Sequence, residues 1–237
     1  MPDPATSETV RGRLALALDT DDLVEALRLA RELEPWFGVA KVGLELFSAT
    51  GPDTVSAFAE RGWKVFVDLK LHDIPTTVNK AARVLGALGA SYLTLHAHGG
   101  AAMLRAGVEG LEAGAASAGL PTPAAIAVTV LTSDDSAPPH ILGKRIAAAL
   151  DGGCRGIVCA ANDVREAKQL APRLIAVVPG IRLDGAPRHD QARAATPQLA
   201  IGAGADLLVV GRAVTGAADR AAAAETIAGA VAAASAA

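Results

Sequence analysis

The chain has 237 residues, of which 51% are hydrophobic and 20% charged, and its formal net charge is −3. This composition is typical of globular proteins, and the length suits one large domain such as an α/β barrel of roughly 250 residues. Mixed charges and only 3% aromatic residues argue against a nucleic-acid partner. The sequence shows neither an apolar run of the roughly 20 residues that span a bilayer nor an apolar N-terminal signal, so we expect a cytoplasmic protein.

Eight short apolar runs rich in β-branched residues alternate with longer segments of helical spacing. We expect strands at Leu14 to Asp19, Val39 to Glu45, Lys64 to Lys70, Tyr92 to Ala97, Ala124 to Leu131, Gly156 to Ala161, Ile175 to Gly180 and Asp206 to Arg212. Near-continuous hydrophobicity is typical of parallel strands that are covered on both faces. The pattern favours a single-domain (β/α)8 TIM barrel over residues 13–237 after a flexible tail, 1–12. A doubly wound open sheet is the main alternative.

Charged side chains collect where the first three predicted strands end. Asp19 closes the first strand, Lys41 lies in the second, and Asp68 and Lys70 end the third, with Asp73 in the loop that follows. In a barrel, the carboxyl ends of the strands meet at one mouth, which holds the active site. A structural ion-pair network is the alternative, but buried charges of alternating sign are a poor source of stability. We therefore interpret these residues as a catalytic array.

The third strand carries the most informative pair. The two-residue spacing of Asp68 and Lys70 predicts that both side chains lie on one face of the strand. A lysine held between two carboxylates stays protonated. Lys70 is therefore suited to donate a proton or to face developing negative charge, and it is unsuited to Schiff-base chemistry, which needs a lowered pKa.

A second group of polar residues follows the last two predicted strands. Pro179 and Gly180 end the seventh strand and Arg182 follows it, and Gly211 and Arg212 end the eighth. Many barrels bind phosphate in these two loops, through backbone N–H groups and an arginine fork. Either arginine alone is equally consistent with a surface charge, but together they predict a phosphorylated substrate. The polar segment 180–191 is long enough to act as a lid over that phosphate.

Other candidate residues give weaker signals. His96 and His98 form an H-x-H pattern that nothing nearby completes into a ligand set, so we expect no metal there. Thr132 and Ser133 follow the fifth strand and either bind a ligand or cap a helix. The two cysteines are five positions apart, which fits neither a disulfide scaffold nor a zinc site, and we expect reduced thiols.

The sequence resembles the orotidine 5′-phosphate decarboxylase family, in its compact bacterial form, over essentially the whole predicted barrel. The most specific stretch is DLKLHDIPTTV at Asp68 to Val78, together with PGIR at Pro179 to Arg182 and VGR at Val210 to Arg212. The core pattern D-x-K-x-x-D alone is shared with sister barrels. The resemblance implies decarboxylation of orotidine 5′-monophosphate (OMP) to uridine 5′-monophosphate (UMP) in pyrimidine biosynthesis, without a cofactor or metal.

The resemblance also implies a role for individual residues. Lys41, Asp68, Lys70 and Asp73 match the catalytic array of the family, with Lys70 as proton donor to C6 of the pyrimidine. The resemblance implies a homodimer in which Asp73 and Thr77 reach across the interface into the partner's site. The implied substrate-binding residues are Asp19 and Lys41 at the ribose, Thr77 across the dimer, Thr132 at the pyrimidine, and Pro179, Arg182, Gln191, Gly211 and Arg212 around the phosphate. One departure is His189, where the family pattern predicts Asn or Asp.

Two other functions are compatible with such a barrel. A magnesium-dependent sugar-phosphate lyase shares the D-x-K-x-x-D pattern but typically has a carboxylate on the second strand, where this chain has Lys41, and a cation there would repel Mg²⁺. A non-catalytic barrel that binds a phosphorylated ligand has no use for carboxylates close to an anion. We therefore favour the decarboxylase, with a small nucleotide as its partner and neither nucleic acid nor membrane.

Overall fold

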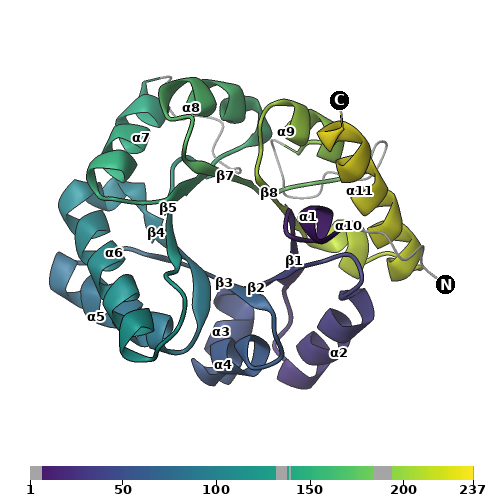
Figure 1. Cartoon of the computed structure of the whole chain (residues 1–237), viewed down its shortest axis with the longest axis horizontal. Coiled ribbons are helices and arrows are strands. Elements are labelled where there is room, and N and C mark those ends of the chain that lie inside the picture. Colours follow the sequence, from purple (N-terminus) through teal and green to yellow (C-terminus); the bar gives the residue numbers. More distant parts are fainter. Residues whose placement is uncertain (1–6, 132–137, 139, 184–193, 237) are drawn as a thin grey trace.

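The computed structural model describes residues 7–131, 138, 140–183 and 194–236. Eight parallel strands form a closed barrel in sequence order, and the last strand pairs with the first (Figure 1). The strands are Leu14–Leu18 (β1), Val39–Gly43 (β2), Lys64–Leu71 (β3), Ala90–His96 (β4), Ala124–Val128 (β5), Gly156–Val158 (β6), Ile175–Val178 (β7) and Leu207–Val210 (β8). This closure confirms the predicted (β/α)8 barrel and excludes the open sheet.

Helices surround the barrel and connect its strands, as Figure 1 shows. The α-helices are Glu8–Arg11 (α1), Leu23–Leu33 (α2), Leu44–Thr50 (α3), Asp53–Ala59 (α4), Pro75–Ala87 (α5), Gly100–Ser117 (α6), Ile141–Asp151 (α7), Val164–Leu170 (α8), Pro197–Gly202 (α9), Arg212–Thr215 (α10) and Arg220–Ser235 (α11), with 3₁₀ turns at Ala97–Gly99 (η1) and Ala161–Asp163 (η2). Helix α1 is capped by Ser7 and buries Val10. Ordered structure therefore begins before residue 13, where we expected the barrel to start.

The strands separate two hydrophobic cores, because alternate residues of a strand face opposite sides. On β1, Leu14, Leu16 and Leu18 pack in the outer core, whereas Ala15 and Ala17 belong to the inner one. Both faces of each strand are thus covered, which explains why the strands are apolar almost throughout. The inner core fills the interior of the barrel with apolar side chains from several strands.

Several strands are shorter than the sequence predicted. Strand β2 ends at Gly43 because Leu44 already begins α3, and β8 ends at Val210 because Arg212 begins α10. Strand β5 ends at Val128, opposite Val158, the last residue of the three-residue β6. The end of β5 thus coincides with the end of its neighbour β6, and this information lies outside the sequence of β5.

Two further features bear on the expected class of protein. Within the described ranges, every helix is too short or too polar to cross a membrane. Cys154 and Cys159 are reduced thiols, as expected, and the structure buries both side chains. Burial raises the pKa of Cys154 to about 12. This thiol therefore stays protonated and unreactive at neutral pH.

Candidate active site

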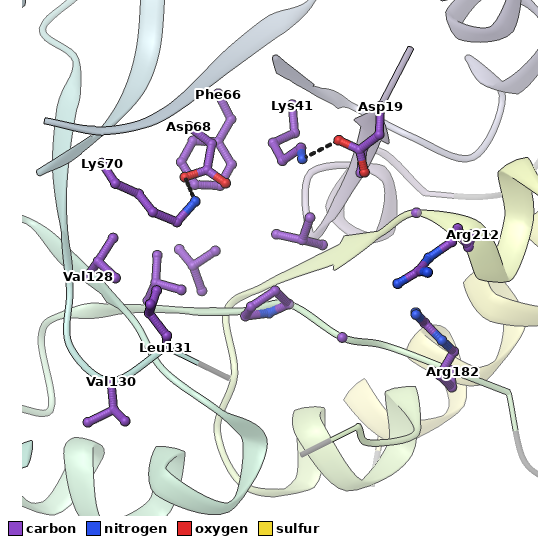
Figure 2. Close-up of a pocket in the computed structure, with 17 residues that line it drawn as sticks. Asp19, Lys41, Phe66, Asp68, Lys70, Val128, Val130, Leu131, Arg182 and Arg212 are labelled. Carbon is purple, nitrogen blue, oxygen red and sulfur yellow. Dashed lines mark hydrogen bonds and ion pairs between the residues drawn. The ribbon is translucent and has the colours of Figure 1, made fainter. Parts of the chain in front are cut away.

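A cavity of about 220 Å³ opens at the carboxyl ends of the strands (Figure 2). It brings together eight of the residues that the sequence assigned to the site, namely Asp19, Lys41, Asp68, Lys70, Pro179, Arg182, Gly211 and Arg212. Its other lining residues are Ala17, Phe66, Val128, Val130, Leu131, Val158, Val177, Gly180 and Val209. The predicted charges therefore share one cavity with an apolar surface.

The first ion pair joins β1 and β2. Lys41 Nζ donates a hydrogen bond to Asp19 Oδ1 over 2.8 Å. The Lys41 side chain is only 11% exposed, whereas that of Asp19 is 53% exposed and free to meet a ligand at the cavity mouth. Gly43 leaves room for the pair, because a Cβ there would lie 3.1 Å from Lys41 Nζ. The packing around the buried Lys41 side chain therefore fixes the position of this ion pair.

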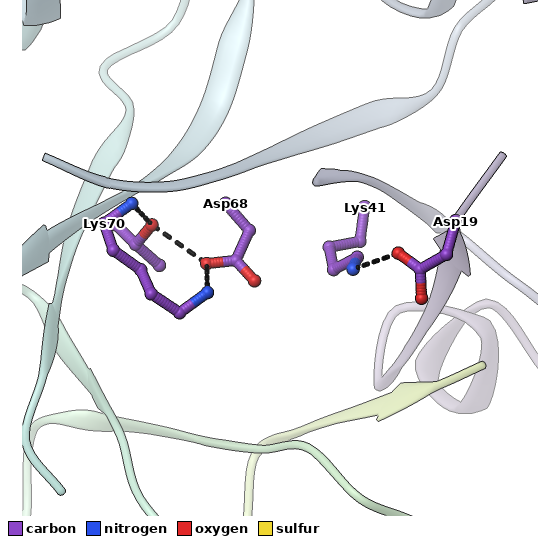
Figure 3. Close-up of polar contacts among 5 residues, drawn as sticks. Asp19, Lys41, Asp68 and Lys70 are labelled. Carbon is purple, nitrogen blue, oxygen red and sulfur yellow. Dashed lines mark hydrogen bonds and ion pairs between the residues drawn. The ribbon is translucent and has the colours of Figure 1, made fainter. Parts of the chain in front are cut away.

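The second ion pair lies on β3. Lys70 Nζ donates to Asp68 Oδ1 over 2.9 Å, as Figure 3 shows. The pair forms as predicted, but our reason for it, the regular period of a strand, is wrong. Lys70 has a φ of 52°, the one positive value outside glycine in the described part of the chain, and the pairing of β3 with β4 shifts register between Val67 and Leu71. A backbone irregularity therefore sets the direction of Lys70.

Asp73, in the loop after β3, and Thr77, in the first turn of α5, both lie outside the cavity. Both are exposed, and Asp73 Oδ1 accepts a hydrogen bond from the backbone N–H of Ile74. Within the described residues of one chain, Asp68 supplies the carboxylate bonded to Lys70, and Asp73 does not lie in the cavity. The expectation that Lys70 lies between two carboxylates is therefore not met within a single chain.

Two arginines occupy the opposite side of the cavity. Figure 2 shows the guanidinium groups of Arg182 and Arg212 pointing toward one another. Arg182 is 7% exposed, and its buried Nε has no hydrogen-bond partner among the described residues. Burial, followed by the charge of Arg212, lowers the pKa of Arg182. A buried guanidinium N–H that is unsatisfied among the described residues, with a second arginine beside it, suits the binding of an anion such as phosphate.

The apolar wall of the cavity was missed by our sequence analysis. Val128 ends β5 and Val130 follows it, Val158 ends β6, and Val177 lies on β7. These positions alternate with outward-facing residues, so strand period alone indicates that they face the barrel interior. The strand period does not indicate which inward-facing side chains line the cavity and which lie deeper in the inner core, because that depends on where each strand begins.

Three histidines cluster beside β4 without forming a metal site. The rings of His96 and His98 each lie 5.5 Å from that of His72, and His96 Nδ1 accepts a hydrogen bond from the backbone N–H of His98. The structure, over its described residues, shows no group of three or more His, Cys, Asp or Glu side chains able to hold a metal ion. Burial, then the charge of Arg145, lowers the pKa of His96.

Two of the predicted site residues, Thr132 and Gln191, lie outside the described residues, as does His189. Most of the segment 180–191 that we expected to act as a lid also lies there. The described end of that segment is anchored, because the N–H of Arg182 donates to the carbonyl of Ala195.

Comparison with known proteins agrees with this geometry. Residues 12–227 match the profile of a family described as orotidine 5′-phosphate decarboxylase / HUMPS. The chain belongs to this family. It is 46% identical over 227 residues to the orotidine 5′-phosphate decarboxylase of Anaeromyxobacter sp. (strain K), covering 91% of this chain and 96% of the relative. It is 40% identical over 230 residues to that of Moorella thermoacetica, covering 92% and 91%.

A solved member of the family has the same architecture. The crystal structure of orotidine 5′-phosphate decarboxylase from Lactobacillus acidophilus superposes with a TM-score of 0.79 at 32% identity, over 92% of this chain and 98% of that one. The resemblance that rested on DLKLHDIPTTV and the two arginine loops is thus confirmed over the whole barrel. The alternative of a non-catalytic barrel has no support in these comparisons.

Proposed function

We infer that the chain decarboxylates OMP to UMP in pyrimidine biosynthesis, and we propose roles for its residues in this reaction. Family membership and the curated relatives carry the activity itself. The observation that carries the residue roles is the arrangement of one cavity, with Asp68–Lys70 on one side and Arg182 and Arg212 on the other. A substrate with a carboxylate at one end and a phosphate at the other fits these two sides.

Lys70 is the proposed proton donor to C6. Loss of CO₂ leaves a carbanion in the plane of the pyrimidine ring, which the π system does not delocalise, so a nearby fixed cation has to stabilise it. The hydrogen bond to Asp68 directs the Lys70 ammonium into the cavity. The same ammonium then donates its proton to C6, which leaves UMP.

Arg182 and Arg212 are the proposed phosphate ligands, with Gly211 and Pro179 beside them. The phosphate is remote from the reacting carbon, so its binding energy is available to order the charged residues around the pyrimidine. Gln191 is assigned to the same phosphate and Thr132 to the pyrimidine by family resemblance alone. Family resemblance also assigns Asp19 and Lys41 to the ribose hydroxyls, and the half-exposed carboxylate of Asp19 at the cavity mouth is compatible with that role.

The most direct test follows the absorbance change as OMP becomes UMP, with enzyme treated with EDTA. Rapid turnover is expected, since the proposed chemistry uses only side chains of this chain. Turnover that appears only when Mg²⁺ is restored would indicate a metal-dependent member of the family. Absence of turnover under both conditions would remove the proposed substrate.

A homodimer is the proposed assembly, with Asp73 and Thr77 contributed to the partner's site. Both residues are exposed on the loop and helix that follow β3, next to Ile74, which is 66% exposed. Family resemblance supports this assembly, and the exposure of both side chains leaves them accessible to a second copy of the chain. A cytoplasmic location stays a prediction.

Mixing two inactive variants tests this assembly. Lys70→Ala and Asp73→Ala should each be inactive alone. If Asp73 serves the partner's site, each hybrid dimer contains one intact site, and random reassortment restores about a quarter of the wild-type activity. No recovery after verified exchange of subunits would place Asp73 in the site of its own chain or outside the chemistry.

A further inference from the structure

A buried threonine, Thr94, contacts both members of the Asp68–Lys70 pair. It lies on β4, is fully buried and is not among the residues that line the cavity. Its hydroxyl donates to Asp68 Oδ1 over 3.0 Å and accepts the backbone N–H of Lys70 over 2.8 Å. One oxygen atom of β4 is therefore hydrogen-bonded to both residues of the pair.

The backbone of Lys70 needs such an acceptor. Val67 pairs with Leu93 and Leu71 pairs with Leu95, so three residues of β3 lie opposite Thr94 alone. The regular ladder of hydrogen bonds is interrupted there, and Lys70 adopts its left-handed backbone conformation at this point. That conformation is unfavourable for a residue with a Cβ and persists only when its surroundings hold it. The Thr94 hydroxyl provides the acceptor that the ladder no longer supplies.

The contacts close into a ring. Asp68 Oδ1 accepts from the Thr94 hydroxyl and from Lys70 Nζ, while Thr94 accepts from the N–H of the same lysine. The dashed lines of Figure 3 show these contacts. Both ends of Lys70, its backbone N–H and its ammonium, are thereby tied to one carboxylate oxygen through short contacts. Such a ring fixes the ammonium more tightly than the ion pair alone, because the carboxylate itself is held.

We propose that Thr94 is a positioning residue, whose hydroxyl holds the Asp68 carboxylate and the Lys70 turn so that the ammonium faces the reacting carbon. The inference rests on the proposed role of Lys70 as proton donor. Thr94 makes no contact with the substrate in this account. It acts on the rate of the chemical step through the geometry of the pair, and not on the affinity for the nucleotide.

Thr94→Val tests the proposal, because valine keeps the shape of threonine and removes only the hydroxyl. We expect kcat for OMP to fall about tenfold to hundredfold, the effect of losing a hydrogen bond to a charged group. The dissociation constant for UMP should stay within about threefold of wild type, since the arginine side is unchanged. Thr94→Ser keeps the hydroxyl and should retain most of kcat.

A matched control separates positioning from stability. Thr54 is also fully buried, and its hydroxyl is hydrogen-bonded to that of Thr50, away from the cavity. Thr54→Val should lower the resistance to urea while kcat stays unchanged. If the valine variant at Thr94 does not fold, Thr94→Ala, which also lacks the hydroxyl and introduces no bulk, is compared with Thr94→Ser in the same assay.

Three results would overturn the proposal. They are an unchanged kcat in the variants that lack the hydroxyl, an equal loss in Thr94→Ser, and a parallel loss of kcat and UMP affinity, which indicates a collapsed cavity. The assay of the wild-type enzyme tests the proposed function separately. If that function is wrong, the wild-type enzyme does not decarboxylate OMP, whatever the Thr94 variants do.

Discussion

The two sides of the cavity differ in how their charges are balanced. On the side of β1 to β3, each lysine is bonded to its own carboxylate, Lys41 to Asp19 and Lys70 to Asp68. On the side of β7 and β8, Arg182 faces the like charge of Arg212, and its Nε has no partner among the described residues. On the first side both lysines are thus paired with carboxylates, whereas on the second side a buried N–H of Arg182 is unsatisfied among the described residues.

This difference assigns the chemical step to the lysine side of the cavity and substrate binding to the arginine side. A cation that is already positioned before the substrate arrives can stabilise a carbanion without rearrangement. Two arginines that repel one another gain most when a dianion enters between them, and that gain appears as affinity. We therefore expect substitutions on the lysine side to lower mainly kcat, and substitutions on the arginine side to raise mainly KM.

Lys70→Ala should have the largest effect. It removes both the cation that faces the carbanion and the proton donor, so we expect kcat to fall by at least about 10³-fold. The affinity for UMP, measured by calorimetry, should change only a few-fold because the phosphate ligands remain. Lys64, exposed at the opposite end of the same strand, provides the control Lys64→Ala, which should retain full activity. An equal loss of turnover and UMP binding would make Lys70 a structural residue.

Arg182→Ala should weaken binding instead. We expect KM for OMP and the dissociation constant for UMP to rise about tenfold to hundredfold, which corresponds to about 1.5–3 kcal/mol for a charged hydrogen bond. Arg173, exposed just before β7, is the matched control, because Arg182 follows the other end of that strand. Unchanged KM in Arg182→Ala would show that the phosphate lies elsewhere.

Asp19→Asn should have a smaller effect. The Asp19 side chain is about half exposed, so its ion pair with Lys41 contributes about 1 kcal/mol or less to stability. We expect kcat/KM to fall roughly tenfold, as for one lost hydrogen bond to a ribose hydroxyl. Steady-state kinetics and urea unfolding measure the two effects. A loss as large as that of Lys70→Ala would place Asp19 in the chemical step.

His96 should produce the smallest effect, and only on the pH dependence of stability. Burial, then Arg145, lowers its pKa below the ordinary value of 6.5 in the folded chain. As the pH falls through 6.5, His96 binds a proton in the unfolded chain before it does so in the folded chain. The free energy of unfolding therefore decreases as the pH falls. Urea unfolding measures the free energy of unfolding at about pH 7.5 and about pH 5.5, and its decrease between the two should be smaller in His96→Asn than in the wild type. An identical decrease in the variant would contradict the assignment.

The fold was predictable because its main signal is local. Each strand of a barrel covered on both faces has to be apolar, so eight apolar runs such as Leu14 to Asp19 identified the architecture. The strand ends were less predictable. Val128 ends β5 because β6 has only three residues, a fact that the sequence around Val128 does not contain.

The site was predictable where a charge interrupts an apolar run. Asp19, Lys41 and Asp68 stand out for that reason, and the structure places all three in one cavity. Thr94 was missed because one threonine in a buried strand resembles ordinary core packing. Its contacts depend on the irregular pairing of β3 with β4 near Lys70, which no period in the sequence indicates.

The assignment of chemistry to the lysine side and of binding to the arginine side is tested most directly by single-turnover kinetics. The rate of OMP decarboxylation is measured at increasing concentrations of Lys70→Ala or of Arg182→Ala. One data set gives both the rate at saturation and the half-saturating concentration of each variant. The account predicts near-normal half-saturation with almost no turnover for Lys70→Ala, and a raised half-saturating concentration with substantial turnover at saturation for Arg182→Ala. The same pattern of loss in both variants would contradict it.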